Sequence, residues 1–295
     1  MLTEFSNQLA DVAAAAAPSV VQVQGRRWRT ASGVVYAPDV VVTTIKALGR
    51  EDGLHVRGHE GEAVDAELAG WDPTTGLALL KAPGLAAPAI AAASQPARVG
   101  HVALAIGRSW SNGLTVSAGV VSIIGGPLRT GRRRAIEQII RTTAPMHDGF
   151  AGGAFVDTTG ALLGVTTAST IRGLAVVIPA AIAWKTAQHL LEHGGVKRGY
   201  IGIGGQPVRL PEPQRAGGAD EALLVVAVSP DTPAARAGIL VGDVILAVDG
   251  QTIASPEDLL DWLTGNRVGK AATVRLLRGG TPTEISVTIG ERGAS

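Results

Sequence analysis

The chain has 295 residues, of which 46% are hydrophobic and 17% are charged, so it can bury large cores and is not a disordered polymer. This length favours about two domains, and the formal net charge of +1 gives no overall attraction to nucleic acid or an anionic membrane. Because there is no cysteine, disulfides, thiol catalysis and thiolate metal sites are excluded.

The N-terminal stretch MLTEFSNQLADVAAAAAPSV has no basic region, and Glu4 and Asp11 interrupt its apolar residues. It is therefore not expected to be a signal peptide or a membrane span. An amphipathic helix that is capped by Thr3 and ended by Pro18 is predicted instead. With no export signal, the protein is cytoplasmic if Met1 is the native start, and its compartment is otherwise open.

After Pro18 the sequence consists of short β-rich runs, from SVVQVQ to LAVVIP, separated by glycine, proline and polar turns. Many short strands with this punctuation favour antiparallel barrels or sandwiches. An amphipathic helix is predicted from Ala181 to His193, with Gly194 and Gly195 ending it. We place a domain boundary there, between residues 1–194 and residues 195–295.

The second segment is again mainly β. Its one clear helix, SPEDLLDWL, has Ser255 at the N-cap and Pro256 as the first helical residue. The final hairpin is predicted to turn at Gly279 and Gly280.

The stretch from Asp148 to Asp157, DGFAGGAFVD, has the pattern of a turn that presents a nucleophile. Glycines flank a central residue and an apolar strand follows. The central residue, Ala151, has no nucleophilic atom, so the turn raises the question of what it does.

Two sets of motifs resemble one family. In residues 1–194, SGVVY, VVTTIKAL, DPTTGLALLKA, VALAIG, TVSAGVVS, IIRTTAP, GFAGGAFVD and GLAVVIP follow the order of HtrA-branch, trypsin-like serine proteases. In residues 195–295, RGYIGI, VSPDTPAARAGILVGDVILAVDGQTI and TVRLLRGG resemble an HtrA-type PDZ domain. The resemblance implies a mainly β chain, with a trypsin-like double β-barrel followed by a PDZ domain.

Proteases of this type use a serine nucleophile, a histidine base and an aspartate that orients the histidine. The matching stretches place Lys46 at the histidine, Gly76 at the aspartate and Ala151 at the serine. Lys46 is normally protonated and is a poor base. We therefore predict a pseudoprotease, not an enzyme, in which the backbone of Gly149 and Ala151 is a remnant oxyanion hole.

The alternative is an active serine-type endopeptidase with a rearranged catalytic centre. Lys46 could pair with a nearby threonine or serine, or His147 and Asp148, just before the turn, could contribute. The other histidines show no metal-ligand spacing with carboxylates, so no metal and no cofactor is expected.

A PDZ domain binds an extended C-terminal peptide as an added strand. By resemblance, the peptide carboxylate lies on the backbone N–H groups of a short loop made of Tyr200, Ile201, Gly202 and Ile203. Lys197 or Arg198 could add charge complementarity. Leu259 and Leu263 share one face of the helix, which is either the other wall of the groove or plain core.

The predicted function is binding of peptides, unfolded chains or partner proteins, in a regulatory, chaperone-like or scaffolding role in protein quality control. The family commonly assembles as trimers through the N-terminal segment and usually acts in the bacterial envelope. A homo-trimer to which Phe5 contributes, or an assembly with an active relative, is therefore expected. Neither nucleic acid nor a membrane span is expected.

Overall fold

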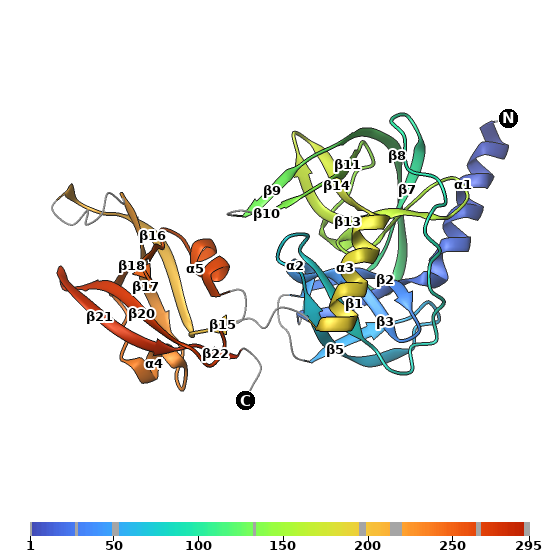
Figure 1. Ribbon diagram of the computed structural model, residues 1–295. Coiled ribbons are helices and arrows are strands. Elements are labelled where there is room, and N and C mark those ends of the chain that lie inside the picture. Colours follow the sequence, from blue (N-terminus) through green and yellow to red (C-terminus); the bar gives the residue numbers. More distant parts are fainter. Residues whose placement is uncertain are drawn as a thin grey trace. The chain divides into compact units, whose positions relative to one another are not determined.

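The computed structural model describes residues 2–26, 29–48, 53–131, 134–194, 199–212, 220–263 and 267–291. The chain divides into two compact units, Met1–Gly195 and Val196–Ser295. Each unit has its own hydrophobic core, and Figure 1 shows the helices and strands that make up each unit. The mainly β architecture predicted from the sequence, two barrels followed by a PDZ-like sheet, is confirmed.

The first barrel is closed by six antiparallel strands in the order β1-β2-β3-β6-β5-β4. Alternate apolar side chains, among them Val21, Val23, Val35 and Val41, point into its core, as expected for β-branched residues on strands. The strands are β1 (Val20–Arg26), β2 (Arg29–Ala37), β3 (Val40–Thr44), β4 (Leu54–Arg57), β5 (Ala63–Trp71) and β6 (Leu77–Lys81).

The second barrel is closed in the order β11-β14-β13-β12-β7-β8. Its core contains Ala105, Val121, Ile140, Phe155 and Val177. The strands are β7 (Val102–Ser109), β8 (Gly113–Gly125), β11 (Ile139–Thr142), β12 (Ala154–Val156), β13 (Leu162–Ile171) and β14 (Leu174–Pro179). Between β8 and β11, β9 (Leu128–Gly131) and β10 (Arg134–Ile136) form a separate hairpin.

The helix predicted at the end of the first unit is α3 (Ala180–His193), and Gly194 follows it with φ of 72°. Its buried residues Ala183, Ala187 and Leu190 recur at helical spacing. They pack in one cluster with Val42 of the first barrel and Val165 of the second. The helix therefore holds the two barrels together.

The N-terminal helix α1 (Leu2–Ala16) begins before Thr3, so the prediction that Thr3 caps it is wrong. It is followed by a short 3₁₀ turn, η1 (Ala17–Ser19), that contains Pro18. The small side chains of Ala13 and Ala16 pack beside Val20 in the core. Within the described residues, no helix is both long and apolar enough to cross a membrane.

The second unit is a sheet in the order β16-β17-β18-β20-β21, in which β19 also pairs with β18. Ser255 caps α5 as predicted, because its Oγ accepts a hydrogen bond from the N–H of Asp258 at 3.1 Å. The elements are β15 (Gly199–Tyr200), β16 (Ile203–Arg209), β17 (Glu221–Val228), α4 (Pro233–Ala237), β18 (Val244–Val248), β19 (Gln251–Thr252), α5 (Pro256–Leu263), β20 (Ala271–Arg278), β21 (Thr281–Thr288) and β22 (Gly290–Glu291).

A buried carboxylate makes the second unit sensitive to acid. Asp243 is 2% exposed and accepts hydrogen bonds from Arg278 at 2.7 and 2.9 Å and from the N–H of Leu240 at 2.9 Å. The hydrogen bonds from Arg278 lower the pKa of Asp243, although burial opposes them. Since the folded pKa lies below the unfolded one, this stabilisation is complete above pH ~4 and is lost as the pH falls through the folded pKa.

We therefore expect the chain to lose stability as the pH falls below about 4, and Asp243→Asn to flatten this part of the profile. Urea denaturation at each pH, followed by circular dichroism, measures it. The matched control is Asp231→Asn, because Asp231 is an exposed carboxylate of the same unit. Equal pH slopes for wild type and Asp243→Asn would contradict this account of the buried pair.

Candidate functional site

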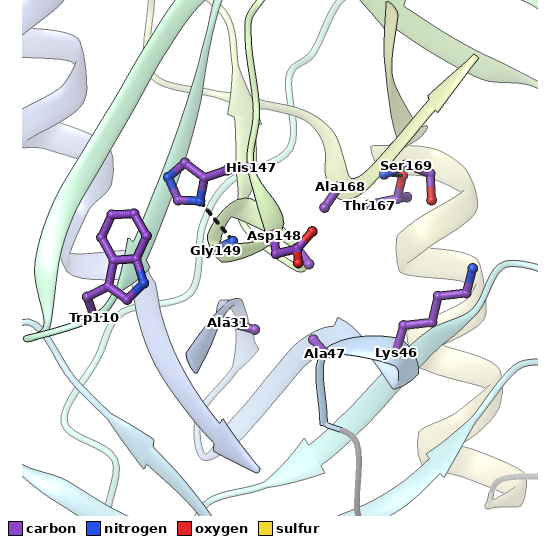
Figure 2. Close-up of a pocket in the computed structure, with 11 residues that line it drawn as sticks. Ala31, Lys46, Ala47, Trp110, His147, Asp148, Gly149, Thr167, Ala168 and Ser169 are labelled. Carbon is purple, nitrogen blue, oxygen red and sulfur yellow. Dashed lines mark hydrogen bonds between the residues drawn. The ribbon is translucent and has the colours of Figure 1, made fainter. Parts of the chain in front are cut away.

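A pocket of about 720 Å³ lies in the first unit where loops of both barrels meet. In Figure 2, Trp110 and His147 lie towards one end of this pocket, and Lys46 and Ser169 lie towards the other. The lining residues are Ala31, Lys46, Ala47, Trp110, His147, Asp148, Gly149, Ala151, Thr167, Ala168 and Ser169. Within the described residues, no group of three or more potential metal ligands is present.

The glycine-rich turn that follows His147 is fixed by hydrogen bonds from both barrels. It contains a 3₁₀ turn, η2 (Asp148–Phe150). From the first barrel, Ser32 Oγ donates to Gly149 O at 2.7 Å and the N–H of Ser32 donates to Ala151 O at 3.0 Å. From β13, Thr166 O accepts the N–H of Gly152 at 2.8 Å. Sequence patterns did not reveal that Ser32 and Thr166 hold this turn.

The two backbone N–H groups of the predicted oxyanion hole have acceptors within the turn itself. The N–H of Gly149 donates to Nδ1 of His147 at 3.0 Å, and the N–H of Ala151 donates to Asp148 O at 3.0 Å. Both donors would have to leave these acceptors before they could bind a developing negative charge. The oxyanion hole at Gly149 and Ala151 therefore stays a prediction.

The three predicted triad positions lie near one another. Lys46, in the short helix α2 (Ile45–Leu48), and Ala151 both line the pocket. Gly76 does not line it, but its carbonyl accepts the N–H of Ile45 at 2.9 Å, next to Lys46. At these positions the side chains supply one ammonium group, no carboxylate and no hydroxyl, so the Ser-His-Asp chemistry is absent from them.

Trp110 is a pocket residue that the sequence analysis missed. Trp110 is 67% exposed, and its ring stacks on that of His147, with 4.8 Å between ring centroids and 12° between planes. His147 in turn contacts the buried ring of Phe150. Because Nδ1 of His147 accepts the N–H of Gly149, that nitrogen carries no proton and the proton of the neutral ring is on Nε2. The sequence around Trp110 contains no pattern that indicates stacking of its ring on His147.

In the second unit, the predicted carboxylate-binding loop has backbone N–H groups that are available as hydrogen-bond donors. Among the described residues, the N–H groups of Ile201 and Gly202 find no acceptor. Gly202 has φ of +83°, and a Cβ there would lie 2.3–2.5 Å from atoms of Thr232. Only glycine therefore fits this position. The loop continues into Ile203, the first residue of β16.

Leu259 and Leu263 of α5 are 6% and 3% exposed and belong to the core of the second unit, together with Ile201. The structure thus supports the core interpretation of these two leucines, and a contact with a bound peptide stays a prediction. Trp262 is also buried in this core, and Arg267 lies 4.1 Å from its ring centroid. Lys197 and Arg198 lie outside the described residues.

Two closed six-stranded barrels with a pocket between them, followed by a small sheet with a glycine loop at its edge, define a trypsin-like peptidase domain and a PDZ domain. The family model described as "Trypsin-like peptidase domain" matches residues 31–165, and the one described as "PDZ domain" matches residues 199–289. "Serine endoprotease DegS" of Escherichia coli (strain K12) is 34% identical over 95% of this chain and 85% of its own length. The chain belongs to the HtrA-type, DegS-like family of serine endoproteases.

Other relatives agree. A "Probable periplasmic serine endoprotease DegP-like" of Brucella suis biovar 1 (strain 1330) is 35% identical over 88% of this chain and 52% of its own length. The solved "HtrA-type protease AlgW with decapeptide" is 28% identical, with a TM-score of 0.56, over 97% of this chain and 99% of its own. The solved serine endoprotease from Yersinia pestis is 34% identical, with a TM-score of 0.54, over 97% of both chains.

These comparisons correct one prediction. Loss of the three triad side chains led us to predict that the chain is not an enzyme. The curated relatives and solved neighbours are named as serine endoproteases or HtrA-type proteases, which contradicts that prediction. The error arose because the three triad positions bear only on the Ser-His-Asp mechanism. The pocket also contains His147, Asp148 and Ser169, whose side chains could act in another mechanism.

Proposed function

We propose that this HtrA-type protein recognises the C-terminal ends of other polypeptides through its PDZ domain. The observation that carries the proposal is the pair of N–H groups at Ile201 and Gly202, which have no acceptor in the described part of the chain and lie on a loop that leads into an edge strand. A peptide carboxylate satisfies such donors, and the peptide backbone extends the sheet. Recognition of chain ends suits a regulatory or chaperone-like role.

Titration calorimetry of the full chain with paired peptides tests this proposal. One peptide ends in a free carboxylate and the other, of the same sequence, ends in an amide. We expect the free acid to bind at least about tenfold more tightly, because hydrogen bonds to an ionised group are the strong ones. Equal affinity for the two peptides would show that the terminal carboxylate is not recognised.

A second candidate function is hydrolysis of peptides by a rearranged centre, which the names of the relatives favour. The pocket holds two side-chain hydroxyls, those of Thr167 and Ser169, and Lys46. Thr167 Oγ1 donates to Val176 O at 2.9 Å, whereas no acceptor among the described residues takes the hydroxyl of Ser169. Ser169 is therefore the better nucleophile candidate, with Lys46 as its base.

Cleavage of fluorescein-labelled casein by the purified chain tests this second function. Ser169→Ala and Lys46→Ala should each abolish the cleavage, whereas Lys185→Ala, at an exposed lysine of α3, should leave it unchanged. Ala151→Ser should add nothing, because the other two triad positions are Lys46 and Gly76 and supply neither an imidazole nor a carboxylate. Cleavage that survives both pocket variants would rule out this centre.

Self-association is part of the proposal. Leu2 and Phe5, 86% and 46% exposed, project apolar side chains from α1. Such residues suit a helix that contacts further copies of the chain. Light scattering of wild type and Phe5→Ser distinguishes a trimer from a monomer, and a monomeric wild type would contradict this part.

A further inference from the structure

Strand β16 is an open edge of the second sheet. Among the described residues it pairs with β17 alone, and α5 lies beside it (Figure 1). An open edge presents one row of backbone N–H and C=O groups to any strand that is added. Which residues supply that row follows from how β16 pairs with β17.

Two hydrogen bonds, one at each end of β16, establish which residues face β17. The N–H of Ser229 donates to Gly202 O at 2.9 Å, and the N–H of Leu210 donates to Asp220 O at 2.9 Å. Since residues of an antiparallel strand alternate between facing the partner and facing away, even-numbered residues from 202 to 210 face β17. Odd-numbered residues of β16 face the open edge.

One irregularity lies between these two ends, and it does not disturb the alternation. The register of β16 against β17 shifts between Gly204, opposite Ala227, and Gly205, opposite Val225. The extra residue is Val226, on β17, so β16 itself has no insertion. The open edge therefore consists of the backbone groups of Ile203, Gly205, Pro207 and Arg209.

Pro207 interrupts this edge because it has no N–H. Proline within a sheet is confined to positions whose N–H would face outwards on an edge strand, and Pro207 agrees with the alternation above. A peptide whose carboxylate lies at Ile201 and Gly202 could pair with Ile203 and then with Gly205. Its next carbonyl would meet the proline ring, where an N–H donor is required.

We infer that this PDZ domain recognises only a short C-terminal tail, because Pro207 ends the backbone ladder after about three peptide residues. The inference rests on the proposed function and adds a substrate class to it: proteins that expose a few terminal residues, with no extended strand required. Residues further from the peptide end contribute little to affinity. Pro207 is thus a residue that determines specificity.

The test uses the full chain and free-acid peptides of three, five and seven residues that share the C-terminal sequence Ala-Val-Leu. For the wild type we expect dissociation constants that agree within about twofold across the three lengths. Pro207→Ala restores an N–H at the edge, so the five- and seven-residue peptides should gain about fivefold while the tripeptide is unchanged. Gln206→Ala is the matched control, because Gln206 is exposed and its backbone faces β17.

Each outcome decides one claim. The inference is overturned if the wild-type affinity rises tenfold or more with peptide length. It is also overturned if Pro207→Ala does not bind the longer peptides more tightly. In either case, Pro207 only prevents other strands from pairing with the open edge of β16. If no free-acid peptide of any length binds the wild type, the proposed function itself fails. Circular dichroism confirms that the variants are folded.

Discussion

Replacing Arg108 with methionine should lower the free energy of unfolding of the first unit by about 3–5 kcal/mol. Arg108 is 3% exposed, which is rare for arginine. Its guanidinium donates to Val20 O at 2.8 Å, Ala17 O at 3.1 Å and Asn112 O at 3.0 Å. One group on β7 therefore joins η1, the start of β1 and the loop before β8.

The electrostatics around Arg108 explain the size of this loss. Burial lowers the pKa of Arg108, and the nearby carboxylate of Glu62 opposes this by raising it. Both carboxylate oxygens of Glu62 are buried and have no hydrogen-bond partner among the residues that the structure describes. Methionine fills the space of the arginine stem but leaves the carboxyl group of Glu62 without the neighbouring guanidinium and removes a donor from three carbonyls.

Calorimetric melting of the full chain measures the change. Adding Glu62→Gln to Arg108→Met should restore part of the stability, because the unpaired charge disappears. Arg129→Met, at an exposed arginine, is the matched control and should change stability by less than about 0.5 kcal/mol. A loss for Arg108→Met below about 1 kcal/mol would show that the guanidinium is not what joins these elements.

Gly202→Ala should destabilise the second unit by about 3 kcal/mol and abolish binding of C-terminal peptides. At φ of +83° an alanine is strained by about 1 kcal/mol or more. Its Cβ would also come within 2.3–2.5 Å of Thr232. Thr232 is buried and caps α4, because its Oγ1 accepts the N–H of Ala235 at 3.4 Å. The same Oγ1 donates to Ser229 O at 2.8 Å, so Thr232 cannot move without breaking these hydrogen bonds.

Gly279→Ala is the control that separates the effect of backbone strain from that of the steric clash with Thr232. Gly279 also has a positive φ, of +57°, but a Cβ there meets nothing within 4 Å. This control should cost about 1 kcal/mol and should retain peptide binding, since Gly279 lies in the turn between β20 and β21. Equal stability losses for the two variants, measured by urea denaturation, would mean that the contact with Thr232 is unimportant.

The architecture could be predicted because it depends on local patterns. Strands such as Val40–Thr44 are runs of β-branched residues, and α3 ends at a glycine. The start of α1 was misjudged because a threonine near a helix terminus resembles a cap whether or not it serves as one.

The candidate sites were predictable only in part, because their properties depend on contacts between distant residues. The turn at Ala151 was visible as a motif, but its anchors Ser32 and Thr166 come from different strands. The position of Pro207 on the open edge could be recognised only from the pairing of β16 with β17. Arg108 could not be foreseen as a buried residue, because arginine is normally exposed and no periodicity marks it.

Hydrogen–deuterium exchange of the full chain tests the central claim most directly. The chain is compared alone and with a saturating free-acid peptide ending in Ala-Val-Leu, and exchange is followed by mass spectrometry of overlapping fragments. We expect slower exchange in the segment from Ile201 to Gly205, where the loop and the open edge of β16 bind the peptide. Binding with unchanged exchange across that segment would show that the peptide is recognised elsewhere.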